Sequence, residues 1–196
     1  MTDISNAWDR IDTWLSTGAP EILAGMAPGA SQAEINTAEQ EMGIQFPDDV
    51  RESYRFRNGQ QYDHNYSSIG GSLIDSFDLL SIRRVVNEWR VWKDLRDASV
   101  FDGIESDPDD GVKRDWWSAG WIPLASNANG DHYCLDLDPA PCGAAGQIIT
   151  MWHDAPEREV VARSFSEWLT QHARELEGGM QLYSHEYGGI VRIEDV

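Results

Sequence analysis

The amino-acid sequence predicts an α+β fold, in which a mostly antiparallel sheet packs against several helices. Helical patterns come first along the chain, strand-like alternation follows between residues 121 and 152, and a helical pattern returns near residue 164. The chain has 196 residues, of which 41% are hydrophobic and nine are tryptophan, so it can bury a substantial core. We expect one domain over residues 1–179 and a C-terminal extension over residues 180–196 that adds a strand to it.

The N-terminal region is predicted to form two helices. On one face of the first lie Ile4, Trp8, Ile11 and Leu15. Gly18 and Pro20 are expected to end it. The second begins at Ser31, which forms a capping box with Glu34, and ends at Gly43, which tolerates a left-handed backbone.

Three further helices are predicted after Pro47, after Ser81 and after Ser164. The first is short and ends at Asn58-Gly59, and the last begins with a second capping box between Ser164 and Glu167. The middle helix is the longest, and its inward residues are expected to be Ile82, Val85, Val86, Trp89, Trp92 and Leu95.

Strands are predicted at residues 121–124, 132–138 and 146–152, with weaker candidates at residues 72–77 and 190–193. The segment HYCLDLD alternates, which is typical of a half-buried strand following an Asn-Ala-Asn-Gly turn. One face would carry Tyr133, Leu135 and Leu137, and the other His132, Cys134, Asp136 and Asp138.

The net charge limits the classes of partner. Asp and Glu number 34 against 15 Lys and Arg, which gives a net charge of −19 and an isoelectric point near 4.4. Such a surface repels nucleic acid and anionic lipid, and it attracts a basic protein. No apolar run is long enough to span a bilayer and no secretory signal is recognised, so we expect a cytoplasmic protein whose two cysteines stay reduced.

The HYCLDLD segment also raises the possibility of a metal site. His132, Cys134 and Asp136 would project from one strand face at intervals of roughly 7 Å. A zinc site needs three or four ligands with a supporting shell, and nothing in the spacing requires His153 to complete one. The sequence therefore favours a structural strand, and we predict no metal ion.

Catalytic patterns are equally weak. There is no GxSxG motif, no phosphate-binding glycine loop, and no basic residue beside Cys134 to generate a thiolate. Five histidines are scattered along the chain, and His172 falls on the inward face of a helix, where a core or boundary position is expected. We predict a protein that is not an enzyme and that binds no cofactor.

Residues 97–117, DASVFDGIESDPDDGVKRDWW, form an acidic segment that ends in two tryptophans. A solvated loop is the simpler interpretation. The alternative is a protein-binding surface, because carboxylates steer basic partners and exposed tryptophan anchors interfaces. One of the two tryptophans should pack inward. The predicted contact residues are Asp102, Glu105, Asp107, Asp109, Asp110, Asp115, Trp116 and Trp117.

Several separated segments together resemble a known family. They are GASQAEINTAEQEMGIQFPDDVRESYRFRNGQ, GWIPLASNANGDHYCLDLDP, GQIITMWHD and VVARSFSEWL, which occur in this order between about Trp8 and about Leu176. They resemble the SUKH superfamily, and within it the branch that contains fungal Smi/Knr cell-wall regulators and many bacterial immunity proteins. The motif positions are Gly59, Gly130, Asp131, Asp136, Gly146 and Trp168.

The resemblance implies a mixed sheet with packed helices and no known catalytic activity. It leaves two functions open. The leading hypothesis is an immunity protein that neutralises a basic bacterial toxin, such as a nuclease, by direct binding, since the strong negative charge suits such a partner. The alternative is a regulatory or scaffold module in cell-wall synthesis or signalling. The oligomeric state is not specified by any pattern in the sequence.

Overall fold

The computed structural model describes residues 3–127 and 129–196. The first two residues of the predicted N-terminal segment, and Ala128 in the predicted turn, lie outside this range. The helices are α1 (Asp3–Gly18), α2 (Pro20–Gly25), α3 (Gln32–Met42), α4 (Asp48–Phe56), α5 (Ile82–Asp97), α6 (Phe165–Glu177) and a 3-10 turn, η1 (Ile193–Asp195). The strands are β1 (Met26–Pro28), β2 (Arg57–Gln60), β3 (Asp78–Leu79), β4 (Asp107–Pro108), β5 (Trp121–Ser126), β6 (His132–Asp136), β7 (Gln147–Met151), β8 (Glu157–Arg158), β9 (Val160–Ala162), β10 (Gln181–Ser184) and β11 (Gly189–Arg192).

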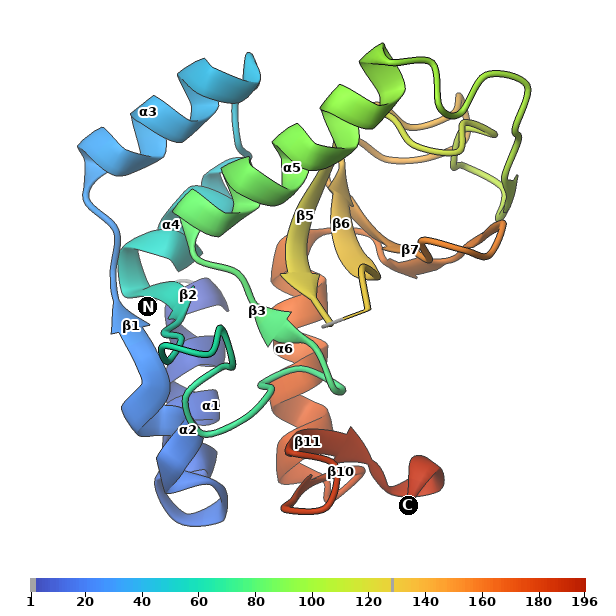
Figure 1. Ribbon diagram of the computed structural model, residues 1–196. Helices are drawn as coiled ribbons and strands as arrows, with labels where there is room; N and C mark the ends of the chain where they lie inside the picture. Colours follow the sequence, from blue (N-terminus) through green and yellow to red (C-terminus); the bar gives the residue numbers. More distant parts are fainter. Residues whose placement is uncertain (1–2, 128) are drawn as a thin grey trace.

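The central sheet has five strands in the order β3-β5-β6-β7-β9, and each neighbouring pair is antiparallel. In its middle, Leu135 of β6 lies opposite Ile122 of β5 and Ile148 of β7. A parallel pair, β4 with β8, lies outside this sheet. The predicted α+β class with a mostly antiparallel sheet is therefore confirmed, and the chain forms a single domain (Figure 1).

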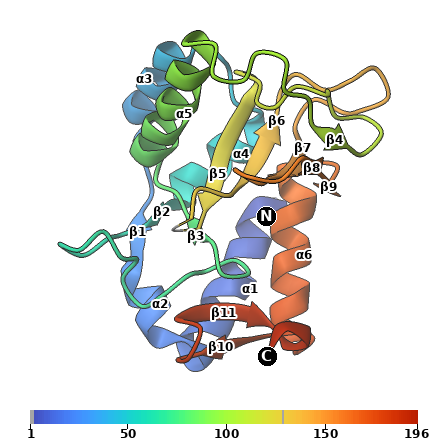
Figure 2. The ribbon, with the colours of Figure 1, turned by 45° about the vertical axis from the view of Figure 1, so that its right-hand side comes forward.

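Helices and loops cover both faces of the sheet. On one face Tyr133 of β6 contacts Trp168 of α6, with ring centroids 5.6 Å apart. On the other, His132 lies edge-on to Trp92 of α5 at 6.2 Å. Figure 2 shows α5 beside the sheet, with α6 and α1 side by side below it. Every residue from His132 to Asp136 is buried, so the predicted half-buried strand is wrong: α5 and the loop that follows it cover the polar face.

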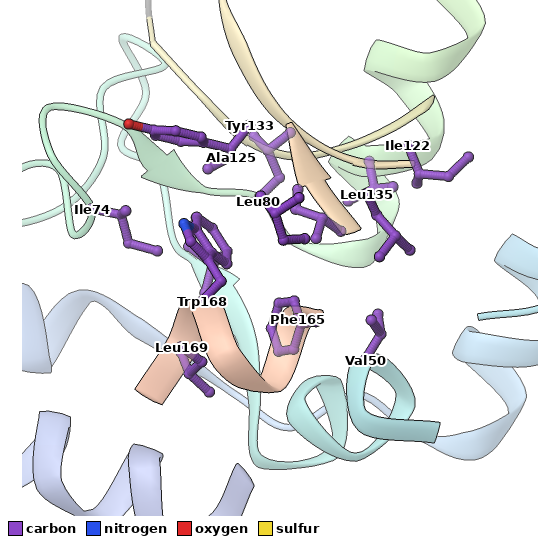
Figure 3. Close-up of a cluster of buried hydrophobic side chains, with 14 of the residues drawn as sticks. Val50, Ile74, Leu80, Ile122, Ala125, Tyr133, Leu135, Phe165, Trp168 and Leu169 are labelled. Atoms are coloured by element: carbon purple, nitrogen blue, oxygen red, sulfur yellow. The ribbon is translucent and has the colours of Figure 1, made fainter. Parts of the chain in front are cut away.

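Apolar side chains packed between the central sheet and α6 form a major part of the core. Phe165 and Trp168 project from α6 toward the sheet in Figure 3, and Trp168 approaches Tyr133, whereas Leu169 points to the other side of the helix. These side chains are nearly inaccessible to solvent. Burial of one large apolar side chain contributes about 1.5–3 kcal/mol. The core holds α6 and the sheet together as one unit.

Local signals placed most helices correctly. The Ser31–Glu34 capping box forms in both directions, and Gly43 adopts φ +69° at the end of α3. Pro20, however, begins helix α2 instead of simply ending the preceding one, because proline suits the first helical turn. Gly59 lies so close to the main chain of Leu80 that a Cβ there would meet its carbonyl carbon at 2.4 Å.

The weaker strand predictions were less accurate. Residues 72–77 form isolated bridges, and the strand in this region is β3, which begins at Asp78. Residues 190–193 contribute to β11, which pairs with β10 as a separate hairpin and does not join the central sheet. Ile190 is fully buried, and the hairpin packs near α6. The boundary at residue 179 remains a prediction.

Candidate functional site

The polar residues of β6 are structural. The Asp136 carboxylate accepts hydrogen bonds from Gln147 Nε2 at 2.9 Å and from the Asp138 backbone N–H at 2.9 Å. The same Gln147 nitrogen also donates to the Gly111 carbonyl at 3.0 Å, which fixes the acidic segment against the sheet. Burial raises the pKa of Asp136 and of the Cys134 thiol. A buried thiol with a raised pKa is a poor nucleophile.

Asp131 and His153 form a second polar cluster with Asp154, and their ligand atoms lie within 4.8 Å of one another. One oxygen of Asp131 accepts from both the backbone N–H and the Nδ1 of His153, each at 2.9 Å, and the other accepts from Asn127 at 2.8 Å. The atoms of Asp131 and His153 that would bind a metal are engaged in hydrogen bonds that hold the turn, whereas Asp154 is exposed. Two of the three candidate ligands would have to give up these bonds to hold a metal ion.

These hydrogen bonds set the charges of the pair. Partial burial by itself raises the pKa of Asp131, but the hydrogen bonds from His153 and Asn127 outweigh it, and the pKa falls below its usual value. The hydrogen bond to Asp131 raises the pKa of His153. The hydrogen bond between them thus favours the charged form of each group, the carboxylate of Asp131 and the imidazolium of His153.

Two further histidines are enclosed in the core. His132 has its Nε2 3.7 Å from the Glu88 carboxylate, and this contact lowers the pKa of Glu88. His172 is buried on α6, as predicted, and burial lowers its pKa to about 4. Neither lies beside Cys134 in a hydrogen-bonded pair, as judged from the described part of the chain.

The acidic segment is folded onto the sheet and is not a freely solvated loop. Asp107 and Pro108 form β4, which pairs with β8. The Asp109 carboxylate accepts from the Val160 backbone N–H at 3.0 Å, so this predicted contact residue has a structural bond. The segment therefore presents its remaining charges from a defined backbone.

Arg158 joins the acidic segment to the core, and no pattern in the sequence indicated this role. Its side chain is completely buried. The guanidinium donates to the carbonyl oxygens of Ala155, Glu157 and Trp116 at 2.6–3.0 Å, and it lies 5.1 Å from the Trp116 ring centroid. Burial lowers the pKa of Arg158 to about 10, so the group stays charged at neutral pH. The bond to Trp116 is a charge-assisted hydrogen bond that ties the acidic segment to this buried group.

The two adjacent tryptophans face different ways. Trp117 is 3% exposed and stacks on Trp92 with centroids 6.5 Å apart, so it belongs to the core and cannot touch a partner in this conformation. Trp116 is partly exposed. Two apolar side chains of the segment that had not been singled out, Val100 and Ile104, are 52% and 46% exposed. The signal available in the sequence was the presence of apolar residues within a charged stretch.

The predicted carboxylates remain at the surface. Asp102, Glu105, Asp107, Asp110 and Asp115 are exposed, and no ion pair with a described residue involves them. Within the segment, Lys113 pairs instead with Asp138 at 2.5 Å. The acidic segment thus combines unneutralised carboxylates with a few exposed apolar groups, which is the composition expected of a surface for a basic partner.

Comparison with known proteins identifies the class of domain. Residues 29–171 match the model of the SMI1 / KNR4 family (SUKH-1), and the chain belongs to this family. The chain is 30% identical over 195 residues to the cell wall biosynthesis/cell cycle regulator smi1 of Schizosaccharomyces pombe, which covers 93% of this chain and 38% of that protein. It is 26% identical over 204 residues to the cell wall assembly regulator SMI1 of Saccharomyces cerevisiae, covering 88% and 40% respectively. The glucan synthesis regulatory protein of Neurospora crassa is 24% identical over 210 residues.

These relatives correct the leading functional hypothesis. They are named as fungal regulators of the cell wall, and none of the three carries the name of a bacterial immunity protein. The prediction of an antitoxin with a bacterial toxin as partner is therefore wrong. Negative charge and aromatic anchors suit any basic protein, so they could not specify a toxin. The chain spans about two fifths of the length of these relatives.

No helix in residues 3–127 and 129–196 has the combination of length and hydrophobicity that crossing a bilayer requires. The relatives are named as regulators, which agrees at this coarse level with the expectation of a protein that is not an enzyme.

Proposed function

We propose that the chain is a non-catalytic regulatory or scaffold module in cell-wall synthesis, that it acts in the cytoplasm, and that it works by binding other proteins. The observation that carries this proposal is the alignment of 93% of the chain with the Schizosaccharomyces pombe regulator at 30% identity. The internal chemistry supports it, because the polar clusters at Asp136, Asp131 and Arg158 are engaged in holding loops to the sheet.

The acidic segment is the proposed contact surface for a basic partner. Its carboxylates at Asp102, Asp107 and Asp110 have no cationic neighbour within ion-pair distance among the described residues. Long-range attraction by such groups accelerates association with a basic protein. Because Arg158 and the β4–β8 pair fix the backbone, binding requires little ordering of the segment.

A chimera tests the proposed function. The aligned region of Schizosaccharomyces pombe smi1 is replaced by this chain in a strain that lacks smi1, and cell-wall glucan content is measured. We expect the chimera to return the glucan content toward that of the wild-type strain. A matched chimera with Trp168→Ala, which removes a core side chain, should fail.

A stably expressed chimera that leaves glucan content at the level of the deletion strain would reject the proposal. A fluorescent tag on the same chimera tests the location, and a signal confined to an organelle or to the outside of the cell would contradict it.

A further inference from the structure

A groove lies between α3 and α5, and the acidic segment takes no part in it. Its volume is about 500 Å³, within the range of about 300–1,000 Å³ typical of small-ligand pockets. Figures 1 and 2 both show these two helices side by side. The apolar and neutral side chains that line the groove are Ala33, Thr37, Ala38, Asn58, Ile82, Val86 and Asn87.

The groove is built in and does not depend on a flexible loop. Helix α3 presents small side chains toward α5, so the space between the helices is not filled. Glu39 of α3 binds Arg51 of α4 through two hydrogen bonds, which fixes α3. Glu41 of α3 pairs with Arg90 of α5 and joins the two helices directly. The walls of the groove are therefore held in place before any partner arrives.

The groove is lined by two carboxylates and two arginines, and one of the arginines has no ion pair with a described residue. Glu34 is engaged in the capping box with Ser31, and Glu41 with Arg90. Arg83 is exposed, and no hydrogen bond or ion pair to a described residue involves its side chain. Arg83 is therefore the charged side chain of the groove that is left to pair with a ligand.

Arg83 also acts against the stability of its own helix. It lies in the first turn of α5, which contains no acidic residue. The positive end of the helix dipole is at this turn, so a cation there is unfavourable and a carboxylate would be favoured. The conflict between local preference and the residue present is typical of positions kept for binding. The guanidinium and the N-terminal end of the α5 dipole therefore both favour a carboxylate as the neighbour of Arg83.

We propose that the α3–α5 groove docks a short segment of a partner protein in which an aspartate or glutamate stands beside aliphatic side chains. The carboxylate pairs with the Arg83 guanidinium, which can accept it in a two-pronged geometry. The aliphatic side chains enter the space above Val86 and Ala33. This occupant has the opposite charge to the one that the acidic segment attracts. The proposal depends on the groove alone and stands apart from the cell-wall assignment.

Selection from a random peptide library displayed on phage tests the proposal with the folded chain as target. We expect enriched peptides that contain an acidic residue next to aliphatic residues. Synthetic copies should bind the Arg83→Glu variant at least about ten-fold more weakly, since one charge-assisted pair is lost and a repulsion is gained. The variant Thr37→Trp, which fills the groove from the other helix, should weaken binding similarly.

Arg96→Glu is the matched control, because Arg96 is an exposed arginine of the same helix that does not line the groove. It should leave the affinity within about two-fold of the wild type, and circular dichroism should show all variants folded. Three results would overturn the proposal. They are selection that yields no peptide with an acidic residue beside aliphatic ones, binding that is insensitive to both groove variants, and a dimer of this chain that Arg83→Glu dissociates, which would make a second copy the occupant.

Discussion

The two ends of helix α5 support surfaces of opposite character. Its first turns line the α3–α5 groove, where Arg83 is an unpaired cation, and its last turn leads into the acidic segment, residues 97–117. The acidic segment is contiguous in sequence and was visible from its charge. The groove combines residues 33–41 with Asn58 and residues 82–90, and none of these stretches is unusual alone. A surface formed by one segment can be predicted from the composition of that segment. A surface formed between segments can be predicted only when their packing is known.

The largest expected effect concerns whether the acidic segment is part of the folded core. Trp117→Ala should lower the free energy of unfolding by about 3–5 kcal/mol, because it removes a buried ring that stacks on Trp92. The neighbouring change Trp116→Ala should cost about 1 kcal/mol, since a partly exposed ring loses its contact with Arg158. Urea denaturation measures both. Equal losses would mean that the segment is not anchored as described.

The second prediction tests the charge of the acidic segment. In Asp102→Asn/Asp107→Asn/Asp110→Asn, the on-rate of an oligolysine peptide should fall by about three- to ten-fold at low salt. The difference should vanish at high salt, where screening acts over a few ångströms. Stopped-flow fluorescence gives the rates. Asp109 is left intact because its carboxylate binds the Val160 backbone.

Its control neutralises three exposed carboxylates in other parts of the fold, through Asp9→Asn, Glu21→Gln and Glu186→Gln. An equal fall in the on-rate for this control would assign the attraction to net charge, and the acidic segment would lose its special role.

The third prediction uses pH to show that the cluster at Asp131 is structural. The pKa of His153 is raised in the folded state, so its contribution to stability is complete below the unfolded value and is lost as pH rises through the folded pKa. The stability difference between the wild type and His153→Gln should therefore shrink as pH rises from about 5.5 to about 8.5. Chemical denaturation at several pH values measures it. A difference that grows over this range would contradict the assignment.

The smallest effect concerns the stability of α5 itself. Arg83→Glu should raise the free energy of unfolding by about 0.3–1 kcal/mol, because a carboxylate replaces a cation at the positive end of the helix dipole. Arg96→Glu, in the last turn, should lower it by a similar amount. Thermal denaturation at low salt compares the stabilities of the two variants. A loss of stability in Arg83→Glu would show that Arg83 supports the fold.

The fold was predictable where local signals dominate. Capping at Ser31 and Ser164, and β-branched residues near Ile148, placed α3, α6 and β7 within a few residues. The short pairs β1–β2 and β4–β8 were not predicted, because two- to four-residue strands carry no periodicity of their own. Their positions depend on tertiary contacts.

The candidate surfaces were less predictable than the fold. Alternation in HYCLDLD indicated a solvent-exposed face. Helix α5 and the loop that follows α5 cover that face, so His132 and Asp136 are interior groups. Leu95 was expected to point inward and is 37% exposed, since the last turn of α5 extends past the sheet. Burial of a polar or apolar residue near an element's end depends on a neighbour distant in sequence, which periodicity alone does not reveal.

Arg158 holds the acidic segment through the main-chain carbonyl of Trp116, and every residue type supplies such an acceptor. Side chains on the outer side of the segment can therefore be exchanged during evolution while the attachment persists. A lineage that acquired a different binding partner could rewrite residues around Asp102 and Ile104 without redesigning the scaffold beneath them. Because Arg158 binds the main chain, the side chains that contact a partner can change while the acidic segment stays attached to the core.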